Sequence, residues 1–282
     1  MSSSTGPGML VLVATPIGNL GDLSERAVEV LSGADLIACE DTRRTGRLLA
    51  HAEITGSNLM RVDQHTEERS AERIIRCIAE GGTVAVVTDA GTPGISDPGE
   101  RLVRSVLDAG FEVSVIPGPA APVAALVVSG LPTARWCMEG FLPRSGSDRS
   151  ERITELAVED RTIVLFESPH RLAGTLEDLT ASFGSERPVA IAREITKLHE
   201  EVWRGTLGEA SSWASSPVKG EVVLVVGGAP PAAGADDERI RALLAEAKST
   251  GASTRDAANE VSRRLGVSRR RAYRLALETS AS

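Results

Sequence analysis

Short apolar runs that alternate with helical patterns constrain the fold of this chain more than any other feature. The runs at residues 9–15, 83–88 and 221–226 are apolar almost throughout, as is typical of strands covered on both faces. A helical pattern at 67–80 ends at Gly81, a common helix stop. Strand–loop–helix repetition of this kind predicts an α/β fold with a mostly parallel sheet and right-handed crossovers.

A second series of strands begins near residue 135. Its strands are expected at 162–166, 188–192, 201–204 and 221–226. The later ones follow one another closely, which favours antiparallel pairing for some of them and predicts a mixed sheet. We therefore expect an N-terminal α/β domain at 9–118 and a C-terminal α/β domain at 119–228, with flexible segments at 1–8 and 229–236.

The last part of the chain, at 237–279, is predicted to be a small helical unit with helix-turn-helix spacing. Its first helix face carries Ala257, Ala258, Val261 and Leu265, and a second helix is expected at 269–278. Residues 237–282 contain ten Lys or Arg and six Asp or Glu, so this part carries +4 and the remainder −12. Its local basic cluster consists of Arg263, Arg264, Arg269, Arg270, Arg271 and Arg274.

The composition limits the possible partners. A net charge of −8 over 282 residues argues against a surface that coats nucleic acid, and 3% aromatic residues are too few for an extended base-stacking platform. No apolar run approaches the roughly 20 residues that span a bilayer, and residues 1–8 do not resemble a secretory signal, so we expect no membrane and a cytoplasmic location. The three cysteines and four histidines form no metal-binding pattern, and we expect no metal.

Three loops that follow predicted strands have the character of a binding site. They lie at 15–22, 89–99 and 117–121 and are rich in Gly, Pro and Asp. Each alone could be an ordinary turn, but ligands of open parallel sheets bind where such loops gather. The chain has no GxGxxG and no GxxxxGK[ST], so a nucleoside without a polyphosphate fits better than a dinucleotide or nucleoside triphosphate.

Five segments identify a family. VATPIGNLGD at 13–22, EDTR at 40–43, TDAGTPGISDPG at 88–99, PGP at 117–119 and AREITK at 192–197 resemble the ribosomal RNA small subunit methyltransferase I family of the tetrapyrrole methylase superfamily. The resemblance implies a two-domain methylase fold that binds S-adenosylmethionine between its domains. It also implies a homodimer that methylates the ribose 2′-hydroxyl of one cytidine in 16S rRNA of the small ribosomal subunit.

The resemblance also assigns site residues by position. The methionine part of the cofactor would be bordered by Asp89, Ala90, Gly91, Thr92, Ser96 and Asp97, with Pro119, Ala120 and Ala121 beside them. The adenosine would be enclosed by Phe166, Glu167, Ser168, Ala192, Arg193, Gly220 and Glu221. Two departures are Phe166, where the family often has Tyr, and Thr66, where it favours Asn.

The acceptor side is less defined. The candidates for a general base are Glu40, Asp41, His65, Glu67, Glu194 and Lys219. Each also has an ordinary structural explanation, such as a loop ion pair between Asp41 and Arg43. Our hypothesis is that Asp41, Arg43 and Glu67 line the acceptor side, and that Arg43 and Arg44 bind RNA phosphates.

Two further functions stay open at this point. One is methylation of a tetrapyrrole of the precorrin type, and the other is a DNA-binding regulator built on the helical unit. The loop at 15–19 and the basic tail favour RNA, because the six clustered arginines would meet phosphates of the small ribosomal subunit.

Overall fold

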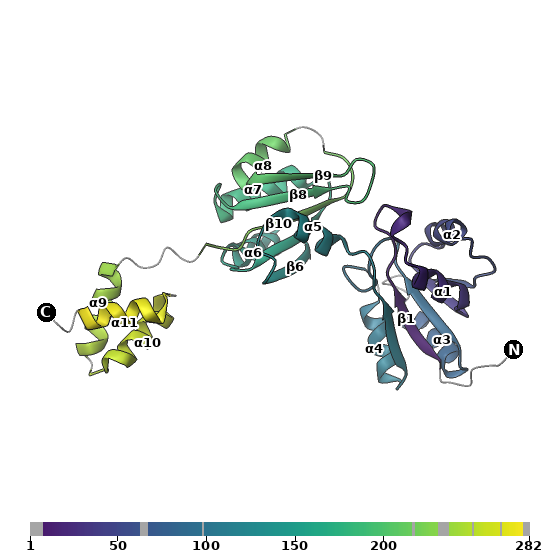
Figure 1. Ribbon diagram of the computed structural model, residues 1–282, viewed down its shortest axis with the longest axis horizontal. Helices are drawn as coiled ribbons and strands as arrows, with labels where there is room; N and C mark the ends of the chain where they lie inside the picture. Colours follow the sequence, from purple (N-terminus) through teal and green to yellow (C-terminus); the bar gives the residue numbers. More distant parts are fainter. Residues whose placement is uncertain are drawn as a thin grey trace.

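Two five-stranded sheets and a three-helix unit follow one another along the chain (Figure 1). The computed structural model describes residues 8–62, 67–97, 99–215, 218–230, 237–249, 251–265 and 267–278. The first sheet is parallel and the second is mixed, so the predicted fold class is confirmed.

The first sheet has the strand order β3-β2-β4-β1-β5, and every pair in it is parallel. Its strands are β1 (Met9–Val13), β2 (Leu36–Cys39), β3 (Leu59–Arg61), β4 (Thr83–Val87) and β5 (Glu112–Ile116). Its helices are α1 (Glu25–Gly33), α2 (Thr42–His51), α3 (Glu67–Ala79) and α4 (Glu100–Asp108). Side chains of α3 and α4 join one buried cluster and those of α1 and α2 another, so both faces of the sheet are covered. This double cover explains the continuous apolar runs.

The second sheet has the order β6-β7-β10-β8-β9, in which only β6 and β7 run parallel. Its strands are β6 (Trp136–Phe141), β7 (Thr162–Glu167), β8 (Pro188–Arg193), β9 (Glu201–Thr206) and β10 (Val222–Val226). Its helices are α5 (Ala121–Ser129), α6 (Ser147–Ala157), α7 (Leu172–Phe183) and α8 (Leu207–Trp213). Helix α5 covers one face and the other three cover the opposite face. The expected domain boundary at 118/119 falls between β5 and α5, and the domain limits themselves stay a prediction.

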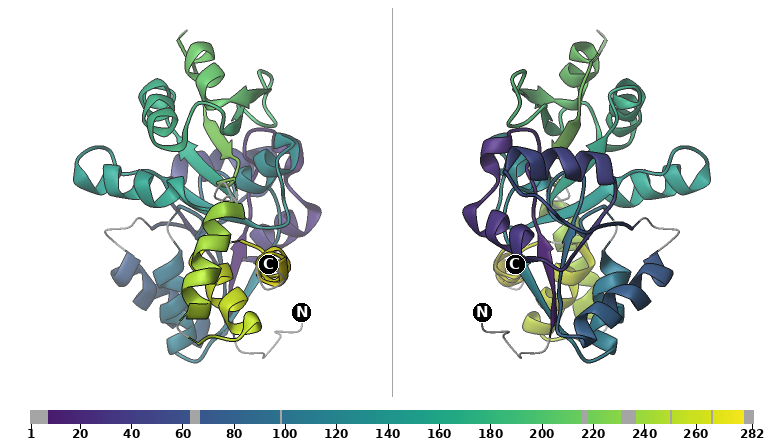
Figure 2. Two further views of the ribbon diagram at one scale, coloured as in Figure 1. Left: turned by 90° about the vertical axis from the view of Figure 1, so that its left-hand side faces the viewer. Right: turned by 90° about the vertical axis from the view of Figure 1, so that its right-hand side faces the viewer.

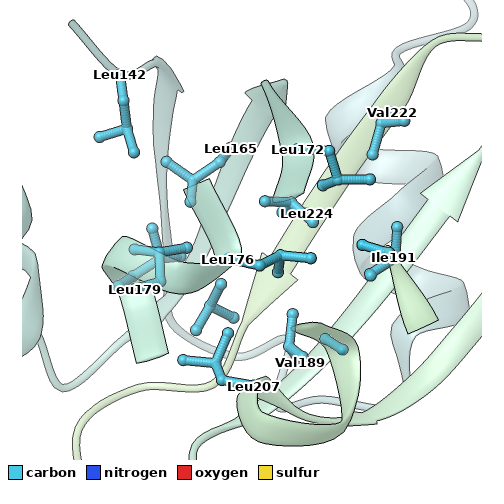
Figure 3. Close-up of a cluster of buried hydrophobic side chains, with 14 of the residues drawn as sticks. Leu142, Leu165, Leu172, Leu176, Leu179, Val189, Ile191, Leu207, Val222 and Leu224 are labelled. Atoms are coloured by element: carbon cyan, nitrogen blue, oxygen red, sulfur yellow. The ribbon is translucent and has the colours of Figure 1, made fainter. Parts of the chain in front are cut away.

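Leu176 on α7 lies at the centre of the larger core of the second sheet. Figure 3 shows it among Leu165, Leu224, Ile191 and Leu207, and its side chain is fully buried. Truncation to alanine removes these contacts and leaves a cavity, so we expect Leu176→Ala to lower the free energy of unfolding by about 2–5 kcal/mol. Urea denaturation measures this value. Glu177→Ala, an exposed neighbour on the same helix, is the control and should stay within about 0.5 kcal/mol.

The C-terminal unit consists of α9 (Asp237–Ser249), α10 (Thr254–Leu265) and α11 (Arg269–Glu278). These helices pack around one buried cluster that includes Leu244, Val261 and Leu275. The predicted helix at 269–278 is confirmed. The left view of Figure 2 looks at the molecule from the side of this unit, which lies in front of the sheets. Of the segments predicted to be flexible, 1–8 and 229–236, residues 1–7 and 231–236 lie outside the described ranges.

No helix in the described part of the chain is long and apolar enough to cross a membrane.

Candidate functional site

A cavity of about 370 Å³ opens between the loops that follow the strands of the first sheet and the strand ends of the second sheet that face them. This volume lies within the range of sites for small molecules, roughly 300–1,000 Å³. Every residue that the resemblance placed around a cofactor lines it, except Asp89, Pro119 and Arg193. Ile17 and Ile95, from two of the loops predicted to bind a ligand, also line it. Further lining residues that were not singled out from the sequence are Pro122, Phe141, Pro169, Ile195, Val222 and Val223.

The three predicted loops of the first half are joined into one wall. The backbone N–H of Thr15 donates to the Gly91 carbonyl at 2.9 Å, and Gly91 N–H donates to the Thr15 carbonyl at 3.1 Å. The Thr92 hydroxyl donates to the Pro119 carbonyl at 3.2 Å, so Pro119 anchors the wall without lining the cavity. Gly91 has a φ of +88°, which glycine adopts without strain. The loop glycines and prolines therefore shape the cavity through the backbone.

The opposite wall depends on a close approach between Gly220 and Glu194. Gly220 has a φ of +92°, and a Cβ there would lie 2.4 Å from Glu194 Cγ. Glu194 Oε1 accepts hydrogen bonds from Lys197 Nζ at 2.8 Å and from Glu221 N–H at 2.9 Å. These bonds lower the pKa of Glu194, with the Lys197 ammonium as the main cause.

The two walls also contact each other directly. The backbone N–H of Asn19 donates to the Thr196 hydroxyl at 3.2 Å, and a Cβ at Gly18 would lie 2.4 Å from Lys197 Cγ. Arg193 does not face the cavity in this arrangement, because it pairs with Glu201 at 2.9 Å. Arg193 also donates to the Lys219 carbonyl, and its expected cofactor role stays a prediction.

Aromatic and acidic residues complete the lining. The rings of Phe141 and Phe166 lie 5.4 Å apart at one side of the cavity. Glu167 is only 3% exposed, and its two oxygens accept bonds from Ser168 N–H at 2.7 Å and the Thr175 hydroxyl at 2.6 Å. With both oxygens engaged, Glu167 stiffens the turn that carries Phe166 and Ser168.

Three carboxylates gather at the first-half side of the cavity. Burial, together with the negative charges of Glu40 and Asp89, raises the pKa of Asp97 to about 6. Burial and Asp89 also raise the pKa of Glu40. Asp89 pairs with Arg44 at 3.1 Å, while its Oδ1 is buried without a hydrogen-bond partner among the described residues. No group of three potential metal ligands is found in the described ranges.

Asp41 and Arg43, which we expected on the acceptor side, interact mainly with each other at the start of α2. Asp41 caps α2 by accepting from Arg43 N–H at 2.8 Å, and it pairs with Arg43 Nη2 at 3.0 Å. The Arg43 side chain lowers the pKa of Asp41 to about 2. Neither residue lines the cavity, and their part in acceptor binding stays a prediction. Glu67 begins α3, but its side chain and His65 lie outside the described structure.

The six clustered arginines of the tail differ in ion pairing and exposure. Arg271 pairs with Asp237 at 2.7 Å, and Arg274 lies 4.0 Å from Glu278. Arg264, Arg269 and Arg270 are exposed, and the side chain of Arg263 is not described. The tail therefore presents only part of its positive charge freely to solvent.

Known proteins resemble the chain over most of its length. The family of tetrapyrrole (corrin/porphyrin) methylases matches residues 9–211. A relative from Synechocystis named ribosomal RNA small subunit methyltransferase I is 45% identical, covering 97% of this chain and 99% of its own. A relative of the same name from Mycobacterium tuberculosis is 44% identical, covering 96% of this chain and 95% of its own.

Solved structures match the two sheet-containing parts. Uroporphyrin-III-C-methyltransferase from Thermus thermophilus has a TM-score of 0.54 at 25% identity and covers 78% of this chain and 94% of its own. The methyltransferase CobJ has a TM-score of 0.61 at 22% identity and covers 79% of this chain and 95% of its own. The CobJ likeness shows the fold alone.

Proposed function

The chain belongs to the tetrapyrrole methylase family, in its ribosomal RNA small subunit methyltransferase I branch, and we propose that it methylates the ribose 2′-hydroxyl of one cytidine in 16S rRNA. Methyltransferases of this family use S-adenosylmethionine. The observation that carries the proposal is the cavity between the two sheets, which is lined by residues of the segments that carry the family resemblance. A ribosomal RNA substrate also favours the cytoplasm as the location.

The residues of the cavity fit this cofactor. Its adenosine needs flat apolar surfaces, which Phe166 and the small residues Ala120 and Ala192 supply. Its sulfonium and ammonium groups are cationic, and Asp97 and Glu221 place carboxylates at the lining. Gly91 and Gly220 line the cavity, and without side chains they would let the cofactor approach the backbone closely. When bound, the cofactor supplies a methyl group that is open to in-line attack.

The chain itself has two tasks in such a transfer. The joined loops hold the reactants in line and exclude water, which can account for much of the rate. The ribose hydroxyl must also lose its proton. Asp97 lines the cavity and has a pKa of about 6, so it is ionised at neutral pH yet basic enough to accept a proton. We assign it this role in addition to its place beside the cofactor.

The direct test of the activity uses labelled S-adenosylmethionine with naked small-subunit RNA and, separately, with assembled subunits. We expect label in RNA at one cytidine ribose, located by nuclease digestion and mass spectrometry. Label on a base, or none in either substrate with cofactor binding intact, would contradict the proposal.

A tetrapyrrole substrate is the second candidate, because the solved neighbour at 25% identity is a uroporphyrin-III-C-methyltransferase. The 45% identity to a ribosomal RNA methyltransferase over nearly the whole chain favours RNA. Incubation with a precorrin in the same assay distinguishes the two. A DNA-binding regulator would need no cavity of this kind, and binding of duplex DNA without cofactor would support it.

We also propose a homodimer. Val123 and Val127, one turn apart on α5, are 47% and 64% exposed, and such apolar residues on one helix face suit contact with a second copy. We expect light scattering to give twice the chain mass, and Val123→Glu with Val127→Glu to weaken the dimer at least tenfold. Val158→Glu, at an exposed valine directly after the C-terminus of α6, is the control. A wild-type protein that is monomeric in light scattering would contradict the proposed homodimer.

A further inference from the structure

A second hollow, of about 440 Å³, lies on the surface of the C-terminal helical unit. It is lined by Arg255 from α10 and by Arg269, Arg270 and Tyr273 from α11. All four side chains are exposed, and none of the three guanidinium groups forms an ion pair with a carboxylate of the described residues. We call these four residues the basic hollow.

The helix ends add to the positive charge of the basic hollow. Arg255 is the second residue of α10, and Arg269 and Arg270 are the first two of α11. Ser268 caps α11 by accepting from Arg271 N–H at 3.2 Å, and the partial positive charge of each helix N-terminus reinforces the arginines. The carboxylate of Asp256, next to Arg255, accepts from the Ser253 hydroxyl at 2.6 Å. The hollow therefore suits an anion such as a phosphate.

The ring of Tyr273 makes the basic hollow more than a phosphate site. Tyr273 is the only tyrosine of the chain, and it is 42% exposed. It lies one helical turn from Arg269 and Arg270, so its ring shares their face of α11. A flat ring beside several guanidinium groups is the combination that binds unpaired nucleotides, because the base stacks while the phosphates pair.

Other arginines of the tail lie in a different environment. Arg241 on α9 pairs with Glu278 at 3.2 Å, and Arg271 pairs with Asp237 at 2.7 Å. Both pairs join α9 to α11. Arg241 therefore offers a matched control that removes one positive charge from the tail outside the basic hollow.

We infer that the basic hollow binds an unpaired segment of RNA, with phosphates on Arg255, Arg269 and Arg270 and one base stacked on Tyr273. The inference rests on the proposed function for the identity of that RNA. Among the clustered arginines of the tail, it selects Arg269 and Arg270 as RNA contacts, and it adds Arg255 from α10 and Tyr273 from α11.

The test measures binding of the full-length protein to a single-stranded RNA of about twelve nucleotides and to the same strand in a duplex, over a salt series. We expect tighter binding of the single strand. Arg270→Ala should reduce the salt slope by about one, while Arg241→Ala should leave the affinity within about twofold of wild type. Tyr273→Ala should weaken binding about fivefold or more, and Tyr273→Phe should retain it because the ring remains.

Three results would contradict the inference in whole or in part. Equal losses of RNA affinity in Arg270→Ala and Arg241→Ala would mean that only the net charge of the tail matters. Unchanged RNA affinity in Tyr273→Ala would contradict the stacking of a base on this ring. A preference for the duplex would overturn the inference and favour a duplex-binding tail. Methyl transfer by the wild type is measured separately, so its failure contradicts the proposed function while these binding results still judge the hollow.

Discussion

Replacement of Asp97 by asparagine is expected to reduce the rate of methyl transfer by about 10²–10⁴-fold, the usual contribution of a positioned general base. Asparagine keeps the size and one acceptor oxygen, but it replaces the other oxygen with an NH2 donor and cannot accept the ribose proton. If Asp97 serves as the base, kcat at saturating S-adenosylmethionine falls by this factor, in addition to any loss of cofactor affinity caused by the missing negative charge. Single-turnover kinetics with saturating cofactor, together with calorimetry for the binding step, separate the two quantities.

The pH dependence of the methyl-transfer rate is a second test of Asp97 as the general base. The pKa of Asp97 is raised to about 6, so the wild-type rate should rise with pH through that value as the carboxylate ionises. The Asn variant should lack this limb. Glu40→Gln removes a negative charge that raises the pKa of Asp97, so this control should shift the limb to lower pH and leave the plateau rate similar. A retained limb in Asp97→Asn, or weakened cofactor binding with a normal kcat, would show that Asp97 only holds the cofactor.

Stability should change in the opposite direction from activity. Because the folded pKa of Asp97 lies above the ordinary value of 3.8, its favourable contribution is complete below that pH and is lost as pH rises through about 6. Asp97→Asn should therefore be more stable than wild type above pH 6, by about 1–2 kcal/mol after allowance for partial exposure. Such a gain is common where a residue serves activity at the expense of stability.

Much of the fold could be predicted from the sequence, because the local sequence patterns agree with the tertiary packing. The continuous apolar runs of β1, β4 and β10 reflect sheets covered on both faces. Helix α2 begins at Thr42 because Asp41 caps it, a signal that the expected ion pair with Arg43 obscured. Helix α8 was not predicted, although Thr206 and Glu209 form a capping box that marks its start.

The cavity could be predicted only in part. Loop residues such as Gly91 and Ser96 belong to segments with an unusual composition, and these stood out. Val222 and Val223 line the cavity from an apolar strand, and nothing in such a run tells which residue faces a ligand. The coupling of Glu40 with Asp97 joins loops that follow different strands, so it follows from the strand order and not from any local pattern.

The second large effect is expected at Gly220. An alanine there must adopt a φ of +92°, which strains an L-residue by about 1–2 kcal/mol, and its Cβ would lie 2.4 Å from Glu194 Cγ. Glu194 can withdraw only by losing its bonds to Lys197 and to Glu221 N–H, which adds roughly 1–3 kcal/mol. Because this wall lines the cavity, we expect Gly220→Ala to weaken binding of S-adenosylmethionine at least about 30-fold in calorimetry.

A second substitution tests whether the collision with Glu194 is the cause. Glu194→Ala removes the side chain that the new Cβ would meet, so the double variant Gly220→Ala with Glu194→Ala should bind the cofactor more tightly than Gly220→Ala alone. Recovery should stay incomplete, because the backbone strain at residue 220 and the loss of the Lys197 bond remain. Gly174→Ala, at a helical glycine with nothing within 4 Å of its added Cβ, is the matched control and should bind normally. Additive losses in the double variant would refute the contact between Gly220 and Glu194 as the origin of the effect, since two residues that collide must instead show coupling.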